Sequence, residues 1–368
     1  MEKNQLTEYR SNNIDQRKIS LLTIHNISNF GSNFQAYALF KFLKDRTNFE
    51  VEIIDYFPVY SRRGTIRQTI AKFLYYRDYL QKRRKVRQFL AKNVVLSERS
   101  YLNFESLKKY PQNSDFYIVG GDQLWNDLHS CGNDPAFKLP FINGKKFSFG
   151  TSLGRRFDQE EINSLKEQIQ DFIALGVRER VSVEQLKESG LNNVHHVVDP
   201  VLLLERKDYE PFIGKVPCQK YMLVYLTPVS ELLNQSIRFI AQSLNLKVVY
   251  IGGFGKHCDC DLHLTNLGPE EILSWLVHAD FVLAASYHAT LFSTLFHKSF
   301  AILLPHIKMN ERITDFLSWT GLENRLILDD SCLNESLFQS IDFAQTDLAI
   351  QKKRDFSQAF LLKQLEMS

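Results

Sequence analysis

The sequence lacks the features that mark several large classes of protein. It has five cysteines in 368 residues, an odd number without the spacing of a disulfide framework, which fits a reducing cytoplasm. No apolar run is long enough to cross a bilayer, and residues 1–17 are polar, without the apolar segment of a signal peptide. The net charge of +3 argues against a nucleic-acid-binding protein. We therefore expect a cytoplasmic protein.

Cofactor motifs are equally scarce. Residues 252–255 (GGFG) follow an expected strand but lack the dinucleotide-binding fingerprint, so we expect a turn there. Two histidines and two cysteines lie within residues 257–263 (HCDCDLH), but their spacing is not that of a structural zinc site, and a polar surface loop is the default interpretation. We predict no metal and no cofactor.

What the sequence does contain is an alternation of apolar strands with helical segments. Its apolar share of 44% and charged share of 24% are those of a globular protein, and its length suits two domains. The alternation predicts an α/β fold in which two Rossmann-like parallel-sheet domains face each other across a cleft. The expected divisions are a disordered leader (1–17), an N-terminal domain (18–205), a C-terminal domain (206–335) and a helical tail (336–368) that can pack back across both domains.

The apolar patterns also predict the individual elements. In the N-terminal domain we expect strands at 19–24, 51–55, 116–119, 146–151, 176–179 and 194–198, and helices at 33–46 and 160–174. In the C-terminal domain we expect strands at 221–226, 248–252, 281–285 and 300–304, and helices at 231–244, 269–278 and from residue 288 or 289.

The segment at 280–296 is the most informative part of the chain. Ser286 and His288 directly follow a buried strand, where the N-terminus of the next helix would present free N–H groups to an anion. An imidazole there can move a proton, although a helix-capping histidine with only a structural role is an equal alternative. Lys308 and Arg312 follow the next strand and would bring cations that suit carboxylate or phosphate. Surface cations are common, so this spacing alone is weak.

Six short sequence blocks occur in order between residues 19 and 325. They are TIHN through NFGSNFQAYAL (23–39), VGGDQLWN (119–126), TSLG (151–154), VRE (177–179), VDPVLLL (198–204) and SYHAT (286–290). With these blocks the chain resembles the polysaccharide pyruvyl transferases, which transfer the pyruvyl unit of phosphoenolpyruvate to a sugar as a ketal. The family usually has serine at Gly121 and glycine at Ala289, so the chain departs from the pattern at two positions.

The resemblance implies a GT-B-like enzyme whose donor lies mainly on the C-terminal domain and whose acceptor lies on the N-terminal one. The family's histidine matches His288, its donor-contacting lysine matches Lys308 by position, and its middle arginine matches Arg178. These residues, together with Arg312 and Ser286, make up the predicted donor site. Phosphoenolpyruvate is the donor substrate that the resemblance implies, and a lipid-linked sugar is the expected acceptor.

A mechanism follows as a hypothesis. His288 would protonate the methylene carbon of the donor, because a group with a pKa near neutrality suits that step. Asp122, in a Gly-Gly-Asp turn, would accept the proton of the sugar hydroxyl, and a turn or helix cap is the alternative role for this residue. No step needs a metal.

Amide and aromatic side chains form the predicted acceptor site. The residues are Asn26, Asn29, Asn33, Gln35, Gln123 and Trp125. Amides around a glycine suit sugar hydroxyls or a diphosphate, and a polar helix-capping loop is the alternative. A tryptophan can stack on a sugar ring but is more often part of a core or an interface.

The stretch 62–92 carries eleven Lys or Arg against one Asp, interleaved with aromatic residues. It predicts a helix that can rest on an anionic membrane surface and so meet a lipid-linked sugar. A solvated basic helix with its aromatics in the core is the alternative, and nucleic acid is a weak third reading without a recognition motif. For the whole protein, the alternatives are a GT-B glycosyltransferase that uses a nucleotide sugar and a non-catalytic glycan- or lipid-binding module.

Overall fold

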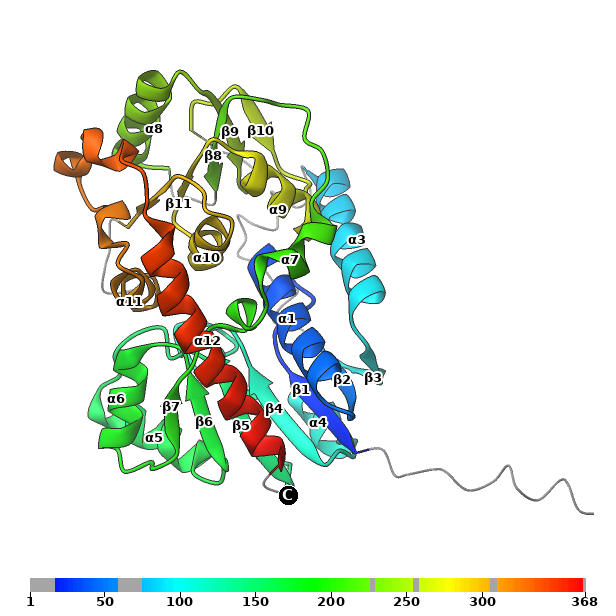
Figure 1. The fold of residues 1–368 in the computed structure, drawn as a ribbon. Coiled ribbons are helices and arrows are strands. Elements are labelled where there is room, and N and C mark those ends of the chain that lie inside the picture. The colour runs from blue at the N-terminus through cyan, green and yellow to red at the C-terminus, as the bar shows by residue number, and fades with distance from the viewer. Residues whose placement is uncertain (1–16, 59–74, 226–228, 254–257, 305–309, 367–368) are drawn as a thin grey trace, which may run out of the picture.

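All strand pairs in the described part of the chain are parallel, and they form two sheets, one in each half of the molecule (Figure 1). The computed structural model describes residues 17–58, 75–225, 229–253, 258–304 and 310–366. The first sheet has seven strands in the order β3-β2-β1-β4-β5-β6-β7, and the second has six in the order β10-β9-β8-β11-β12-β13. In both sheets the strand order reverses beside the first strand, and the carboxyl ends at such a switch point are where ligands of open α/β sheets bind.

The N-terminal half comprises the first sheet and its covering helices. Its strands are β1 (Lys18–Leu22), β2 (Glu50–Tyr56), β3 (Leu96–Tyr101), β4 (Phe116–Gly120), β5 (Lys145–Thr151), β6 (Ala174–Val177) and β7 (Val194–His196). Its helices are α1 (Phe30–Arg46), α3 (Tyr76–Asn93), α4 (Phe104–Lys109), α5 (Gln159–Ile169) and α6 (Arg180–Glu188), with short 3-10 helices η2 (Pro135–Lys138) and η3 (Pro200–Leu203).

The C-terminal half comprises the second sheet, reached through α7 (Arg206–Tyr209) and η4 (Glu210–Phe212). Its strands are β8 (Tyr221–Tyr225), β9 (Lys247–Ile251), β10 (Leu262–Leu264), β11 (Phe281–Ala284), β12 (Phe300–Leu303) and β13 (Leu326–Ile327). Its helices are α8 (Glu231–Leu244), α9 (Pro269–His278), α10 (Tyr287–Leu295) and α11 (Glu311–Thr320), followed by the long tail helix α12 (Phe343–Glu366). The central strands β8, β11 and β12 are continuous apolar runs because both of their faces are buried.

The tail helix α12 contacts both halves. Thr346, in its first turn, donates a hydrogen bond to the carbonyl of Thr320 at the end of α11 (3.0 Å). Further along, Arg354 donates to the carbonyl of Leu202 (2.6 Å), and Phe360 stacks on a phenylalanine of β5. The helix therefore ties the second sheet to the first, as Figure 1 shows in red.

Aromatic residues of α1 join the two halves. Phe30 and Phe34 both lie against Phe292 of α10, with ring centroids 5.5 and 5.4 Å apart. Phe34 also meets Tyr209 and Phe212 of the connection between the halves. One continuous core therefore runs from the first sheet to the second, and it fixes the N-terminus of α1 beside the N-terminus of α10.

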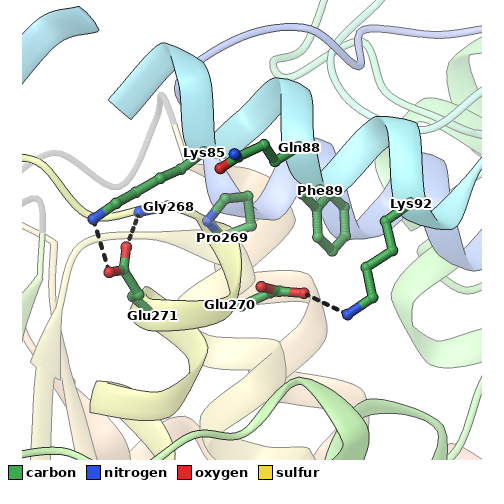
Figure 2. Close-up of a pocket in the computed structure, with 8 residues that line it drawn as sticks. All are labelled: Lys85, Gln88, Phe89, Lys92, Gly268, Pro269, Glu270 and Glu271. Carbon is green, nitrogen blue, oxygen red and sulfur yellow. Dashed lines mark hydrogen bonds and ion pairs between the residues drawn. The ribbon is translucent and has the colours of Figure 1, made fainter. Parts of the chain in front are cut away.

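A second contact between the halves lies at the surface, between α3 and α9 (Figure 2). Lys85 pairs with Glu271 at 2.7 Å, and Lys92 pairs with Glu270 at 4.0 Å. We call these four residues the helical clamp. Lys85 also donates to the carbonyl of Asn266 (3.1 Å), so part of the basic stretch predicted at 62–92 is engaged by the C-terminal half.

Several element boundaries differ from the sequence prediction. Helix α1 begins at Phe30, three residues earlier than expected, because Asn29 caps it by accepting from the amide of Gly31 (3.0 Å). Strand β3 was not predicted, since its sequence LSERSY is polar and lies at the sheet edge. The predicted leader, apart from Arg17, and residues 62–74 of the basic stretch lie outside the described residues.

Among the described helices, none combines the length and the apolar character that a bilayer-spanning segment needs. Within the described ranges, no three histidine, cysteine or acidic side chains are grouped as a metal site requires, and His257 lies outside those ranges.

Candidate functional site

His288 lies at the seam between the halves, in the first turn of α10. Ser286 caps this helix by accepting from the amide of Ala289 (3.4 Å), and its hydroxyl therefore has a structural partner. The imidazole is only 5% exposed and packs on Gly31 of α1. A Cβ at residue 31 would lie 2.2 Å from Nδ1 of His288, so only glycine allows α1 to approach this closely.

A buried carboxylate connects His288 to Arg178. Asp199, at the start of η3, is 1% exposed, and its Oδ2 accepts a hydrogen bond from Nη1 of Arg178 at 2.6 Å. The same oxygen lies 3.7 Å from Nε2 of His288. Glu179 holds the guanidinium from another side, with Oε1 3.2 Å from Nε of Arg178. The family resemblance drew attention to Arg178 and His288, and the structure adds the two carboxylates that hold them.

Asp122 approaches the same guanidinium from the loop after β4. It has φ of +56°, an uncommon conformation for a residue other than glycine, and it follows Gly121 at +74°. Its Oδ2 accepts from the hydroxyl of Ser32 (2.7 Å), and its Oδ1 lies 3.8 Å from Nη2 of Arg178. Backbone strain of this kind is concentrated at functional sites.

The charges around Asp122 decide its protonation. Burial alone would raise its pKa, but Arg178, His288, Arg312 and the hydrogen bond from Ser32 lower the pKa to about 2. Asp122 is therefore ionised at neutral pH and weakly basic.

Arg312 of α11 completes the group from the C-terminal half. Its guanidinium carbon lies 5.8 Å from the ring centre of Tyr287, and that of Arg178 lies 4.6 Å from the same ring. The amide of Gln123, with its oxygen turned toward α11, accepts from both terminal nitrogens of Arg312, at 3.3 Å for Nη2. The halves thus meet through Arg312 and Gln123 as well as through His288.

We call these six residues the buried charge cluster: Asp122, Arg178, Glu179, Asp199, His288 and Arg312. Three of its nitrogens, Nη2 of Arg178, Nε2 of His288 and Nε of Arg312, are buried and have no hydrogen-bond partner among the described residues. Buried polar atoms nearly always find partners, so three unmet donors in one place indicate a site for a ligand with several acceptor oxygens.

The protonation of the imidazole follows from these neighbours. Burial lowers the pKa of His288, and the positive charges of Arg178 and Arg312 lower it further. The negative charges of Asp199 and Asp122 raise it, but the net shift is downward. Burial and the charge of Arg178 also lower the pKa of Arg312. With His288 neutral, the cluster has two positive and three negative groups. An anionic ligand therefore requires a further cation or the protonation of His288. The predicted donor-site residue Lys308 lies outside the described residues.

The structure distributes the predicted acceptor residues unevenly. Asn29 caps α1, and Asn33 is buried and donates to the carbonyls of His25 (2.5 Å) and Ile27 (3.2 Å). Both therefore have the helix-capping and loop-holding roles that were the alternative. Gln35 is also buried and packs on Gly121, and its amide oxygen has no partner among the described residues. Asn26 is partly exposed in the middle of the loop between β1 and α1.

Trp125 is a correction to the prediction of a sugar-stacking residue. Its indole is 1% exposed and packs edge-on against Phe172 in the core of the N-terminal half. Its Nε1 donates to the carbonyl of Phe137 (3.0 Å). The ring has no face open to a ligand, because an apolar side chain gains more from burial in the core than from exposure at a loop.

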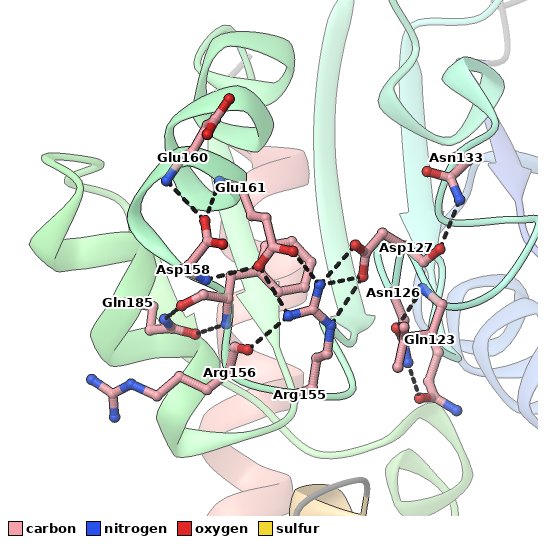
Figure 3. A network of polar contacts seen from close by, with 12 residues as sticks. Gln123, Asn126, Asp127, Asn133, Arg155, Arg156, Asp158, Glu160, Glu161 and Gln185 are labelled. Atoms are coloured by element: carbon pink, nitrogen blue, oxygen red, sulfur yellow. Dashed lines mark hydrogen bonds and ion pairs between the residues drawn. The ribbon is translucent and has the colours of Figure 1, made fainter.

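The loop that carries Gln123 is anchored to α5 by an arginine (Figure 3). Arg155 donates through Nε and Nη2 to Asp127, at 3.1 and 2.7 Å, and through Nη2 to Glu161 at 2.6 Å. Glu161 also completes the cap of α5. This network, whose residues are not part of the buried charge cluster, holds in place the loop that carries Gln123.

The architecture matches solved structures that share little sequence with this chain. A putative UDP-N-acetylglucosamine 2-epimerase from Listeria monocytogenes is 12% identical, with a TM-score of 0.56 over 94% of this chain and 95% of that one. A UDP-GlcNAc 2-epimerase from Neisseria meningitidis, solved with UDP-GlcNAc, is 10% identical, with a TM-score of 0.54 over 96% and 100%. An O-GlcNAc transferase mutant from Thermobaculum terrenum is 11% identical, with a TM-score of 0.51 over 95% and 66%. These likenesses confirm the predicted GT-B-like fold of two parallel-sheet α/β domains.

At the level of sequence, no curated protein matches the chain. The family described as polysaccharide pyruvyl transferase matches residues 29–306, which include Gly31, Asp122, Arg178, Asp199 and His288. This match covers most of the chain, and it confirms the resemblance drawn from the six sequence blocks. The chain therefore belongs to the polysaccharide pyruvyl transferase family.

Proposed function

We propose that the protein transfers the pyruvyl group of phosphoenolpyruvate to two hydroxyls of a sugar in a cell-surface polysaccharide precursor, and releases phosphate. The observation that carries the proposal is the buried charge cluster, where an imidazole and two guanidinium groups each have a buried nitrogen without a partner among the described residues. Phosphoenolpyruvate has a carboxylate and a phosphate, and their oxygens can accept from all three.

The reaction needs one proton donor and one proton acceptor. A proton adds to the methylene carbon of the donor, and a sugar hydroxyl attacks the adjacent carbon and loses its proton. The carbon–oxygen bond to phosphate then breaks, and a second hydroxyl attacks the same carbon and closes the ketal. One of the two hydroxyl protons restores the proton donor, and the other leaves with phosphate or solvent.

His288 is our candidate for the proton donor. Burial lowers its pKa in the free protein, so the ring is neutral there at pH 7. A phosphate dianion beside the ring would raise the pKa again, because an opposite charge favours the protonated form. Bound phosphoenolpyruvate would thus favour protonation of His288, the group that must protonate it. We therefore expect the protein to take up a proton when phosphoenolpyruvate binds.

Arg178, Arg312 and Lys308 are our candidates for holding the donor and stabilising the departing phosphate. In the guanidinium of Arg178, Nε and Nη1 are hydrogen-bonded to carboxylates. Nη2 has no hydrogen-bond partner among the described residues, so it is the nitrogen that can bind the ligand. Asp122 is our candidate for receiving the hydroxyl proton. With a pKa of about 2 it is a weak base, so in this role it orients the hydroxyl and accepts the proton only late, as the new carbon–oxygen bond forms.

We further propose a lipid-linked acceptor and a peripheral contact of α3 with membrane. The outward face of α3 carries Arg77, Arg84 and Arg87, all exposed, next to Tyr76 and Leu80, which are 57% and 45% exposed. Cationic and apolar side chains side by side suit an anionic lipid surface. Lys85 and Lys92 do not belong to this face, since they pair with glutamates of α9.

Flotation with liposomes that contain anionic lipid tests the membrane contact. We expect co-flotation that is lost when Arg84 and Arg87 are both replaced by glutamine. Equal recovery of both proteins, or no flotation of the wild type, would remove the membrane contact from the proposal.

The main test is an assay with phosphoenolpyruvate and a panel of lipid-linked sugars, read as phosphate release and as pyruvyl ketal in the product. We expect His288→Ala to abolish turnover while the protein stays folded. His297→Ala is the matched control, because His297 is an exposed histidine that pairs with Asp347 away from the cluster. Near-normal turnover by His288→Ala would remove His288 from the chemistry.

The same panel tests the two other functions considered from the sequence. Nucleotide release from a nucleotide sugar, without phosphate release from phosphoenolpyruvate, would indicate a GT-B glycosyltransferase. Binding of glycan or lipid without turnover of any donor would indicate a binding module.

A further inference from the structure

The side chain of Asp199 divides its two oxygens between different tasks. Oδ1 accepts from the amide of Val201 at 3.0 Å and so caps η3. Oδ2 accepts from Nη1 of Arg178 at 2.6 Å and lies 3.7 Å from Nε2 of His288. A cap needs only one oxygen, so the second is available for the two groups that the proposed chemistry uses.

We propose that Asp199 is a positioning residue that holds His288 and Arg178 in place and keeps the proton of the neutral imidazole on Nε2, the nitrogen that has no hydrogen-bond partner among the described residues of the buried charge cluster. The inference rests on the proposed function for its purpose, but its geometry does not depend on the identity of the substrate. Asp199 touches no reacting atom, and it acts through its two partners.

The orientation of the ring follows from where its two nitrogens lie. Nε2 is buried, faces Asp199 and has no hydrogen-bond partner among the described residues, whereas Nδ1 lies on the side of Gly31. At 3.7 Å the contact between Nε2 and Oδ2 is electrostatic and not a hydrogen bond, so Nε2 remains open to a ligand oxygen. The carboxylate still favours the tautomer that carries its proton on Nε2, because a carboxylate can only accept. At metal sites, carboxylates beside ligating histidines fix the tautomer of the ring in a similar way.

The electrostatic effect of Asp199 has a definite sign. The charged groups that face His288 are Asp199 and Asp122 from the N-terminal half, with Arg178, and Arg312 from α11. Of the two carboxylates, Asp199 contributes more to keeping the imidazolium stable against burial. Removing its charge therefore lowers the pKa of His288 and leaves less of the protonated form at any pH near neutrality.

The chain offers a matched control in Asp134. It also precedes a proline and caps a 3-10 helix, with Oδ1 accepting from the amide of Ala136 at 2.9 Å. Its Oδ2 accepts from the hydroxyl of Tyr56 at 2.6 Å. In both residues asparagine keeps the oxygen that caps the helix, so Asp134→Asn reports the cost of the same change without contact to His288.

The first experiment follows His288 itself by NMR, with ring-labelled histidine and assignment through His288→Gln. In the wild type we expect the neutral ring to carry its proton on Nε2, and a ring protonated on Nδ1 would overturn the proposal without any Asp199 variant. In Asp199→Asn we expect the titration midpoint to fall by about one pH unit, as loss of one close opposite charge predicts. Asp134→Asn should leave the midpoint unchanged. An unshifted midpoint in Asp199→Asn would also overturn the proposal.

The second experiment measures kcat/KM for phosphoenolpyruvate against pH. If protonated His288 is the donor, the rate falls as pH rises through its pKa, and in Asp199→Asn this alkaline limb moves to lower pH. A lower rate with an unmoved limb would mean that Asp199 is only structural. Failure of the wild type to use phosphoenolpyruvate would refute the proposed function, and the NMR titration would still decide the role of Asp199.

Discussion

Two of the regions where the halves of the protein meet have opposite character. In the helical clamp, Lys85 and Lys92 reach Glu271 and Glu270 through side chains that are partly open to water. In the buried charge cluster, the charged groups are enclosed, and three nitrogens lack hydrogen-bond partners among the described residues. Exposed pairs contribute little to stability, whereas buried unmet donors cost free energy. The comparison indicates that the clamp adds little to the contact between the halves and that the cluster, which costs free energy, is maintained for chemistry.

Removing a charge from the cluster should have the largest effect. Arg178→Gln leaves Asp122, Glu179 and Asp199 buried without their shared cation, and we expect a loss of about 3 kcal/mol or more in the free energy of unfolding. Chemical denaturation measures this loss. Arg155→Gln is the control, since Arg155 also bridges two carboxylates but is more exposed, and it should lose less.

The same variant should have a characteristic pH dependence. Asp122 has a pKa of about 2 in the folded protein, below its unfolded value, so it stabilises the fold above about pH 4 and loses this contribution as pH falls toward 2. Without Arg178 the folded pKa of Asp122 rises. The stability deficit of Arg178→Gln should therefore be largest above pH 4 and shrink in acid, and a deficit that does not change with pH would contradict this account.

Crowding the seam should have an intermediate effect on stability and a large effect on turnover. Gly31→Ala places a methyl group 2.2 Å from the His288 ring, and we expect a cost of about 1–3 kcal/mol from overpacking. A displaced imidazole should lower kcat by about a hundredfold. Gly214→Ala is the control, because the nearest atom to its new methyl would lie 3.8 Å away. Equal activity of the two variants would show that His288 tolerates displacement.

Breaking the clamp should have the smallest effect. Lys85→Ala removes a partly exposed pair with Glu271, and we expect it to lower the free energy of unfolding by less than about 1 kcal/mol, with less effect at high salt. The turnover number should be unchanged. A loss of activity comparable to that of Gly31→Ala would mean that the clamp also governs the site.

Much of the fold was predictable because its central strands are buried on both faces. Strands such as β4, β8, β11 and β12 are short apolar runs, and helices such as α8 and α9 follow from periodicity. The edge strand β3 was missed because it is polar, and its pairing with β2 depends on contacts that no local pattern encodes.

The site was predictable in part for a similar reason. Two arguments singled out His288, Arg178, Arg312 and Asp122: the position of residues directly after strands, and the family resemblance. The structure brings all four together. The partners of Arg178 were missed, although Asp199 lies in a block that the resemblance used. An Asp-Pro pair after a strand reads locally as a helix cap, and only the tertiary fold turns its second oxygen toward Arg178 and His288. Trp125 was misassigned because a tryptophan in a loop gives no local sign of whether it points into the core.

The contact between Gly31 and His288 lies where the candidate reactive residues of the two halves meet. The C-terminal half, with the second sheet, carries Tyr287, His288 and Arg312. The N-terminal half, with the first sheet, carries Asp122, Arg178 and Asp199. A hinge movement that parted the sheets would draw the imidazole away from its carboxylate and separate these residues. Substrate would then enter in an open conformation in which the reactive residues are apart, and react only in the closed one. Water that enters the open conformation would therefore find no complete active site.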